Sequence, residues 1–358
     1  MHSSTSNFDF NRVIPALPWR HLALATSAIV LVAAAAWEIR ARRLGYVPSL
    51  NDTTDLWAQE RRKLKPDSIV VIGDSRALFN TDLDALEAAF GQRPLQLALA
   101  GTSGYPVLAD LVADKNFKGT IIASLLPALW LVPQGPPVDE AKAAIKRFQD
   151  QTVAQRVSHQ LGVLLEERLA CLKQEDLTLK QLLNRIRLAD RPGALVPPAL
   201  PPYFQTTDRD RRTWMAPACA VPGPLQDRVK FGWLPLFQPP PPPSWIPQDQ
   251  FLKGVEAAIE KRFQDTAAAV REFRARGGKL VFVRFPYTGK LKEIEDAATP
   301  RAGPWERILK ESGAPGIYYS DHPELSGFDC PEWSHLSGPD SVEFTKRLVP
   351  HLQAALAR

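Results

Sequence analysis

A short apolar segment that ends in a polar turn constrains the fold of this chain more than any other feature. Residues 69–72 are Ile-Val-Val-Ile, Gly73-Asp74-Ser75 follows at once, and a helix-compatible stretch covers Ala77–Phe90. This order is typical of a buried first strand that leads into the first helix of a parallel α/β domain. Two interpretations of the turn are open: Asp74 and Ser75 cap the helix, or Ser75 is a nucleophile beside backbone N–H donors.

Further strand-like segments alternate with helical patterns, which predicts an α/β domain with about five parallel strands. The clearest amphipathic helix covers 250–276 and ends in a Gly-Gly pair before the next strand. The strands are expected at 68–72, 95–100, 119–125, 279–285 and 316–319, and further helices at 138–167, 177–188, 305–312 and 340–356. The carboxyl ends of such strands are where functional side chains gather.

A carboxylate and a histidine lie on a short loop before the last expected helix. Glu332 precedes His335 by three residues, so it can orient the imidazole as a general base. Asp329 is the alternative acid. Of the six histidines, His335 is the best placed to meet Ser75, and His322 is the fallback.

These two motifs together resemble the SGNH/GDSL hydrolase superfamily. Gly73-Asp74-Ser75 resembles its first sequence block, and Glu332-x-x-His335-Leu-Ser resembles its last block, Asp-x-x-His. The resemblance covers roughly residues 66–125 and 250–355. It implies a flavodoxin-like, three-layer α/β/α fold and a catalytic triad of Ser75, His335 and Glu332. It also implies an oxyanion hole made by the backbone N–H groups of Ser75 and Gly101, with Gly104 as the alternative glycine.

The chain departs from the family in its third block, where an Asn usually follows the third strand. Residues 124–130 are Ser-Leu-Leu-Pro-Ala-Leu-Trp and contain no Asn. Loss of one oxyanion donor typically costs about 100- to 1000-fold in rate. Two functions are therefore expected. The first is a serine esterase or O-acyltransferase acting on acetyl esters of an envelope or exported polysaccharide. The alternative is a catalytically weak, membrane-tethered binding or assembly subunit of a polysaccharide export system.

An uncharged apolar run at residues 22–37 predicts a membrane segment at 21–39, after a polar tail at 1–20. The run is a little shorter than the ~20 residues of a usual spanning helix. A signal anchor, a cleaved signal peptide and a buried helix of a soluble domain are the alternatives. Arg40, Arg42 and Arg43 favour a cytoplasmic C-terminal side, whereas the resemblance implies a periplasmic domain at 45–358.

An insertion is expected at 131–248, between the third and fourth strands. Its helical part is predicted either to cap the site or to cover the sheet. Its proline-rich part includes five consecutive prolines at 239–243, which favour a polyproline II spacer. The aromatic residues around it could stack on sugar rings or pack against the prolines: Trp214, Phe231, Trp233, Phe237 and Trp245.

Charge and cysteine usage narrow the classes of partner and cofactor. The net charge of +5 is spread along the chain without a long Lys/Arg block, so nucleic acid is not an expected partner. No Cys/His spacing resembles a zinc site and no nucleotide motif is present, so neither a metal nor a cofactor is expected. The three cysteines allow one bridge, Cys219 to Cys330, or remain reduced.

Overall fold

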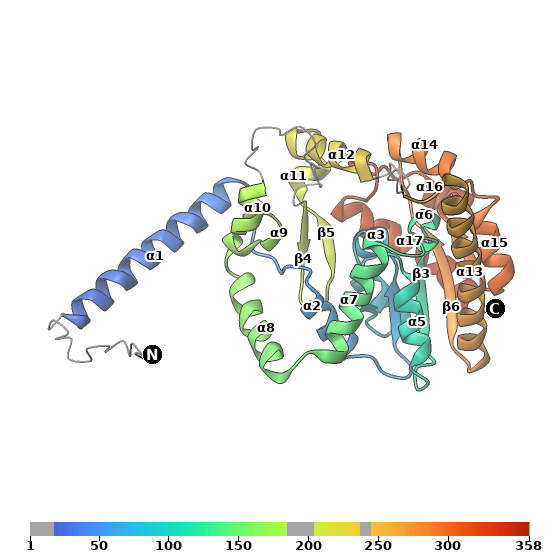
Figure 1. The fold of residues 1–358 in the computed structure, drawn as a ribbon, viewed down its shortest axis with the longest axis horizontal. Coiled ribbons are helices and arrows are strands. Elements are labelled where there is room, and N and C mark those ends of the chain that lie inside the picture. The colour runs from blue at the N-terminus through green and yellow to red at the C-terminus, as the bar shows by residue number, and fades with distance from the viewer. Residues whose placement is uncertain (1–17, 185–203, 237–244, 358) are drawn as a thin grey trace, which may run out of the picture. The chain divides into compact units, whose positions relative to one another are not determined.

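The computed structural model describes residues 18–184, 204–236 and 245–357. The chain divides into two units, residues 1–46 and 47–358. Of the first unit, α1 (Trp19–Arg43; blue in Figure 1) is a helix of 25 residues with a mean hydropathy of 2.0 over its most apolar window, and none of that window is buried. At 1.5 Å per residue the helix is about 37 Å long and could cross a bilayer core of about 30 Å. It could serve as a membrane anchor or a signal sequence.

The second unit is built on the predicted parallel sheet, which has five strands in the order β2-β1-β3-β6-β7. These strands are β1 (Ile69–Ile72), β2 (Leu95–Gln96), β3 (Thr120–Ser124), β6 (Lys279–Arg284) and β7 (Gly316–Tyr318). Four of them lie within one residue of the predicted bounds. The exception is β2, which was expected to reach residue 100. Beyond Gln96, the Arg211 side chain donates to the carbonyls of Gln96 and Ala98, and so covers this edge of the sheet.

Two groups of helices pack on this sheet. α3 (Ser75–Asn80) and α4 (Leu83–Phe90) both contact α17 (Gly338–Leu356), whereas α5 (Tyr105–Ala113) and α15 (Pro304–Ser312) both contact α13 (Gln248–Ala275). All four residues of β1 are buried, and so are the last four of β3. Because alternate side chains of a strand point to opposite faces, both faces of the sheet are covered.

Two stretches predicted as single helices are each divided by a capping residue. The first predicted helix is broken between α3 and α4, where the Asp82 side chain accepts a hydrogen bond from Ala85 N. The predicted helix at 138–167 is broken between α7 (Pro136–Asp150) and α8 (Val153–Glu166), where Thr152 and Gln155 form a capping box. Apolar residues recur at spacings of three and four on both sides of each break, so periodicity alone did not reveal the breaks.

The insertion contains more regular structure than predicted. An antiparallel hairpin of β4 (Gln205–Thr207) and β5 (Thr213–Met215) precedes α12 (Pro224–Leu236). The proline run 239–243 and residues 185–203 lie outside the described residues. The remaining elements of the second unit are α2 (Thr54–Arg61), α6 (Pro127–Trp130), a 3-10 turn (Ala170–Leu172), α9 (Gln174–Leu177), α10 (Leu179–Asn184), α11 (Pro217–Ala220), α14 (Gly289–Ala298), a second 3-10 turn (Tyr319–Asp321) and α16 (Pro323–Ser326).

The predicted bridge between Cys219 and Cys330 is wrong for this structure, because both of these cysteines are free thiols. Cys219 and Cys330 are both buried. Burial, reinforced by the nearby Glu332 carboxylate, raises the pKa of Cys219 to about 12 and that of Cys330 well above its usual value. The reduced alternative is the one that the structure contains.

Candidate functional site

The turn after β1 is fixed by close contacts at the end of β3. Gly73 has a φ of +129°, and a Cβ on it would lie 2.5 Å from the Cβ of Ser124, so only glycine fits here. Asp74 caps α3 through Oδ1, which accepts from Arg76 N at 2.8 Å, while its Oδ2 accepts from Ser124 Oγ at 2.8 Å. Asp74 therefore stabilises the turn. Ser75, the first residue of α3, is half-buried.

The second motif forms the predicted acid–histidine pair. Nδ1 of His335 lies 2.9 Å from Oε1 of Glu332, which also accepts from the His335 backbone N–H, and both side chains are fully buried. The other carboxylate oxygen, Oε2, accepts from Nε1 of Trp233. Asp329, the alternative acid, is exposed. A carboxylate at Nδ1 holds the imidazole with its Nε2 lone pair free to take a proton.

The free nitrogen of His335 lies in an aromatic enclosure. Its ring centroid is 4.4 Å from that of Phe79 and 5.8 Å from those of Phe204 and Trp233. Nε2 is buried, and among the described residues it has no hydrogen-bond partner. In a purely structural site, a buried polar atom without a hydrogen-bond partner costs free energy. A general base, by contrast, needs a nitrogen that is still unpaired when it accepts the substrate proton.

The His335 loop lies along the helix that Ser75 begins. Nε of Arg76 is 3.3 Å from Oγ of Ser334, and Leu336 N donates to Oδ1 of Asn80 at 2.9 Å. Phe79, the ring nearest His335, is one helical turn after Ser75. In the described structure Ser75 and His335 form no hydrogen bond, and such bonds often tighten only when substrate is bound.

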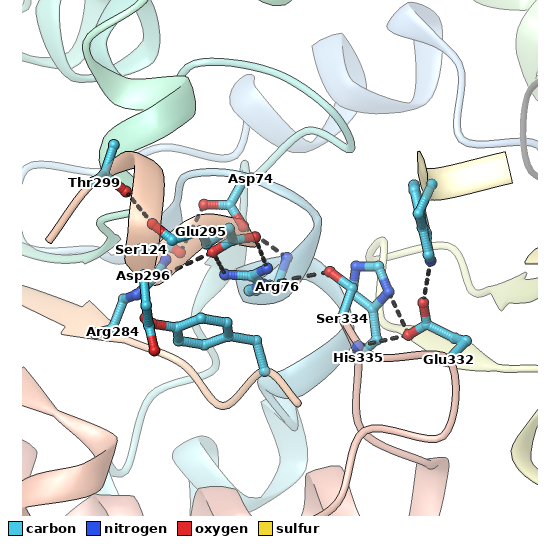
Figure 2. Close-up of polar contacts among 12 residues, drawn as sticks. Asp74, Arg76, Ser124, Arg284, Glu295, Asp296, Thr299, Glu332, Ser334 and His335 are labelled. Carbon is cyan, nitrogen blue, oxygen red and sulfur yellow. Dashed lines mark hydrogen bonds and ion pairs between the residues drawn. The ribbon is translucent and has the colours of Figure 1, made fainter. Parts of the chain in front are cut away.

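Behind Ser75 lies a buried charge network that the sequence did not reveal. Glu295 of α14 accepts from Arg76 Nη1 at 2.9 Å and from Arg284 Nη2 at 2.6 Å, and these side chains are at most 4% exposed (Figure 2). Burial opposes ionisation of Glu295, but the two guanidinium groups outweigh it and lower the pKa of this carboxyl. The ring of Tyr287 lies under both cations, with its centroid 4.7 Å from Cζ of Arg76 and 4.1 Å from Cζ of Arg284. Through Arg284, the last residue of β6, the network anchors α3 to the end of that strand, and Arg76 also contacts the loop that carries Ser334.

The two glycines predicted for an oxyanion hole lie in different surroundings. Gly101 has a φ of +69° and is exposed, with open space where a Cβ would be. Gly104 is buried, and a Cβ on it would lie 2.9 Å from the Cα of Gly73 and 2.6 Å from Trp130. The backbone of Gly104 is therefore the one seen to pack directly against the turn that carries Ser75.

The fallback histidine lies at the far end of α17. The ring of His322 packs on that of His351, with centroids 4.0 Å apart. His351 is 13 residues after Gly338, the first residue of α17, which corresponds to about 20 Å along the helix. His335 precedes Gly338 by three residues. The structure thus brings His335, and not His322, to α3.

Of the predicted aromatic residues, only Trp233 is seen to reach this site. Trp245 and Phe231 are 81% and 65% exposed, Trp214 lies under Arg212, and Phe237 is outside the described residues. Together, Glu332 and Trp233 can hold His335 as a base beside α3, which begins at the half-buried Ser75. No protein-family model, no curated protein and no solved structure matches this chain.

Proposed function

We propose that this chain is a membrane-anchored SGNH-type serine esterase or O-acyltransferase, acting on acyl, chiefly acetyl, esters of an envelope or exported polysaccharide. One observation carries the proposal: the buried Glu332–His335 pair lies along the helix that begins at Ser75, and Nε2 of His335 has no hydrogen-bond partner in the part of the chain that the structure describes. The strand order also supports the proposal. If the five strands of this sheet are numbered 1 to 5 in chain order, their order across the sheet is 2-1-3-4-5, which is the order of flavodoxin-like folds.

The chemistry follows from the arrangement. Ser75 Oγ attacks the acyl carbonyl while His335 Nε2 accepts its proton, and Glu332 stabilises the resulting imidazolium. The sugar oxygen leaves with that proton, and an acyl-enzyme remains on Ser75. Water or a second sugar hydroxyl then attacks this ester, with His335 again as the base. The N–H groups of Ser75 and Gly101 would hold the oxyanion, with Gly104 as the alternative to Gly101.

For this step, Ser75 Oγ and His335 Nε2 must come within about 2.6–3.2 Å of each other. The α1 segment would hold the domain at the membrane on the periplasmic side, near polysaccharide synthesis or export proteins. No cofactor takes part in this scheme.

A serine-directed fluorophosphonate tests the proposal on the full chain in detergent. We expect labelling at Ser75, identified by peptide mass spectrometry, and its loss in Ser75→Ala and His335→Gln. Ser158→Ala, at an exposed serine of α8, is the matched control and should label like the wild type. Labelling that persists in His335→Gln would contradict the role of His335 as the base.

A binding or assembly subunit is the second candidate, and one observation favours it. His335 is fully buried beneath Trp233 and Phe204, without a hydrogen bond to Ser75. A hollow of about 650 Å³ is lined mostly by apolar side chains of α6, α13 and the α14–α15 connection, and none of Ser75, Glu332 or His335 lines it. Equal acetate release from an acetylated sugar by wild type and Ser75→Ala, with saturable glycan binding by both, would establish this second function.

A further inference from the structure

Three potential metal ligands meet on the second unit, away from the proposed catalytic residues. They are His322, Glu324 of α16 and His351 of α17. One ligand atom from each lies within 4.8 Å of the other two, and Nε2 of His351 is 2.6 Å from Oε1 of Glu324. The two imidazole rings are also in direct contact, with their centroids 4.0 Å apart.

The chemistry of this set favours one class of ion. Two imidazoles and a carboxylate are ligands that Zn²⁺ takes in sites with three protein ligands and an open fourth position. Imidazole also suits Cu²⁺ and Ni²⁺, whereas Mg²⁺ and Ca²⁺ prefer oxygen. Around a tetrahedral zinc the ligand atoms lie roughly 3.3 Å apart, given Zn–N distances of about 2.0–2.1 Å. The three side chains are exposed or half-buried, so rotation about their side-chain bonds would adjust them to this spacing.

The backbone that carries these ligands is held independently of any metal. The carbonyl of His322 accepts from the N–H groups of Leu325 and Ser326, at 2.9 and 3.0 Å. The carbonyl of Glu324 accepts from Arg347, which lies one helical turn before His351 on α17. The ligands therefore start close to their bound positions, so less conformational entropy is lost on binding.

We propose that His322, Glu324 and His351 form a binding site for a divalent transition-metal ion, with Zn²⁺ preferred and a water molecule in the fourth position. The ion would join the β7–α16 segment to the C-terminal part of α17. Since the first turn of α17 follows the His335 loop, the ion would stabilise the helix on which that loop depends. The site does not rest on the proposed esterase function, because it shares no residue with it.

The test uses the full chain in detergent, without an affinity tag and stripped with a chelator. Titration with Zn²⁺ should show one equivalent bound and a higher Tm. Co²⁺ should give visible d–d absorption typical of four-coordinate cobalt without a thiolate charge-transfer band, which would exclude the cysteines as ligands. His351→Ala should weaken Zn²⁺ binding by at least about 100-fold, and Glu324→Gln by about tenfold.

His159→Gln is the matched control, because His159 is a half-buried histidine of α8 outside the cluster. It should bind zinc like the wild type. Equal zinc affinity in His351→Ala and wild type, or a cobalt spectrum dominated by thiolate charge transfer, would overturn the proposal. Circular dichroism of His351→Ala separates loss of the site from loss of the fold.

Discussion

The two sides of the Ser75 turn are built in contrasting ways. On one side, Arg76, Glu295 and Arg284 form a buried ionic network in which the carboxylate is paired with both guanidinium groups. Asp74 accepts hydrogen bonds from Arg76 N and Ser124 Oγ beside it. On the other side, Glu332 holds one nitrogen of His335, and the other nitrogen is enclosed by rings and has no hydrogen-bond partner among the described residues. Pairing on the first side fixes the backbone, whereas the missing partner on the second leaves a base available. In the proposed mechanism, the ionic network positions Ser75, and the aromatic side contains the base, His335.

The largest effect on the rate of the proposed reaction is expected from Glu332→Gln, on the side of the turn where aromatic rings enclose His335. Without a carboxylate at Nδ1, His335 loses its orientation and the stabilisation of its charged form. The rate of acyl transfer, and of fluorophosphonate labelling, should fall by about 10⁴-fold. Asp329→Asn, at the exposed alternative acid, should stay within about twofold of wild type. The reverse result would assign the orienting role to Asp329.

Glu295→Gln tests the ionic side and should act on stability. It leaves two buried guanidinium groups without a counter-charge, which costs about 3–5 kcal/mol in the free energy of unfolding. Denaturant unfolding, compared with wild type, measures this loss. Glu293→Gln, at an exposed position on the same helix, should change it by less than about 0.5 kcal/mol. A Glu295→Gln protein as stable as the control would refute the structural role of the network.

Trp233→Phe should have a smaller effect, because it keeps an aromatic ring beside His335 and removes one N–H donor to Glu332. A hydrogen bond to a charged group is worth about 1.5–3 kcal/mol, so labelling should slow by roughly 10- to 100-fold. Trp245→Phe, at an exposed tryptophan, is the control and should label at the wild-type rate. An unchanged labelling rate in Trp233→Phe would show that Trp233 contributes only packing against His335 and that its N–H group does not affect the reaction.

The smallest effect concerns pH. The folded-state pKa of Glu295 lies below its usual value of 4.5. The stability it contributes is therefore complete above about pH 4.5 and is lost as the pH falls through the lower, folded-state pKa. Unfolding measured from pH 7 down to pH 3 should show an acid decline that is shallower in Glu295→Gln than in wild type. Parallel declines would show that other carboxylates account for it.

Predictability from the sequence differs between these same two sides. Gly73, Asp74 and Ser75 were predicted to form a turn at a strand end, because that inference needs only an apolar run and its immediate neighbours. Glu332 and His335 were found for the same reason, since three residues separate them on one loop. Glu295 was missed because its partners are 219 and 11 residues away, and the spacing of single charged residues along a chain does not show which of them pair. Trp233 was predicted only as one of five candidate aromatic residues, and no local signal distinguished it as the partner of Glu332, which it reaches from the insertion.

What the sequence determined by itself is the set of short-range features: four of the five strands, the turn at Gly73-Asp74-Ser75, the apolar N-terminal helix and the acid–histidine pair. Each depends on periodicity or on residues a few positions apart. The tertiary structure decided which distant groups meet, including the Arg76–Glu295–Arg284 network, the rings around His335 and the His322–Glu324–His351 cluster. These contacts join segments that the sheet brings together, and spacing along the chain contains no information on that geometry.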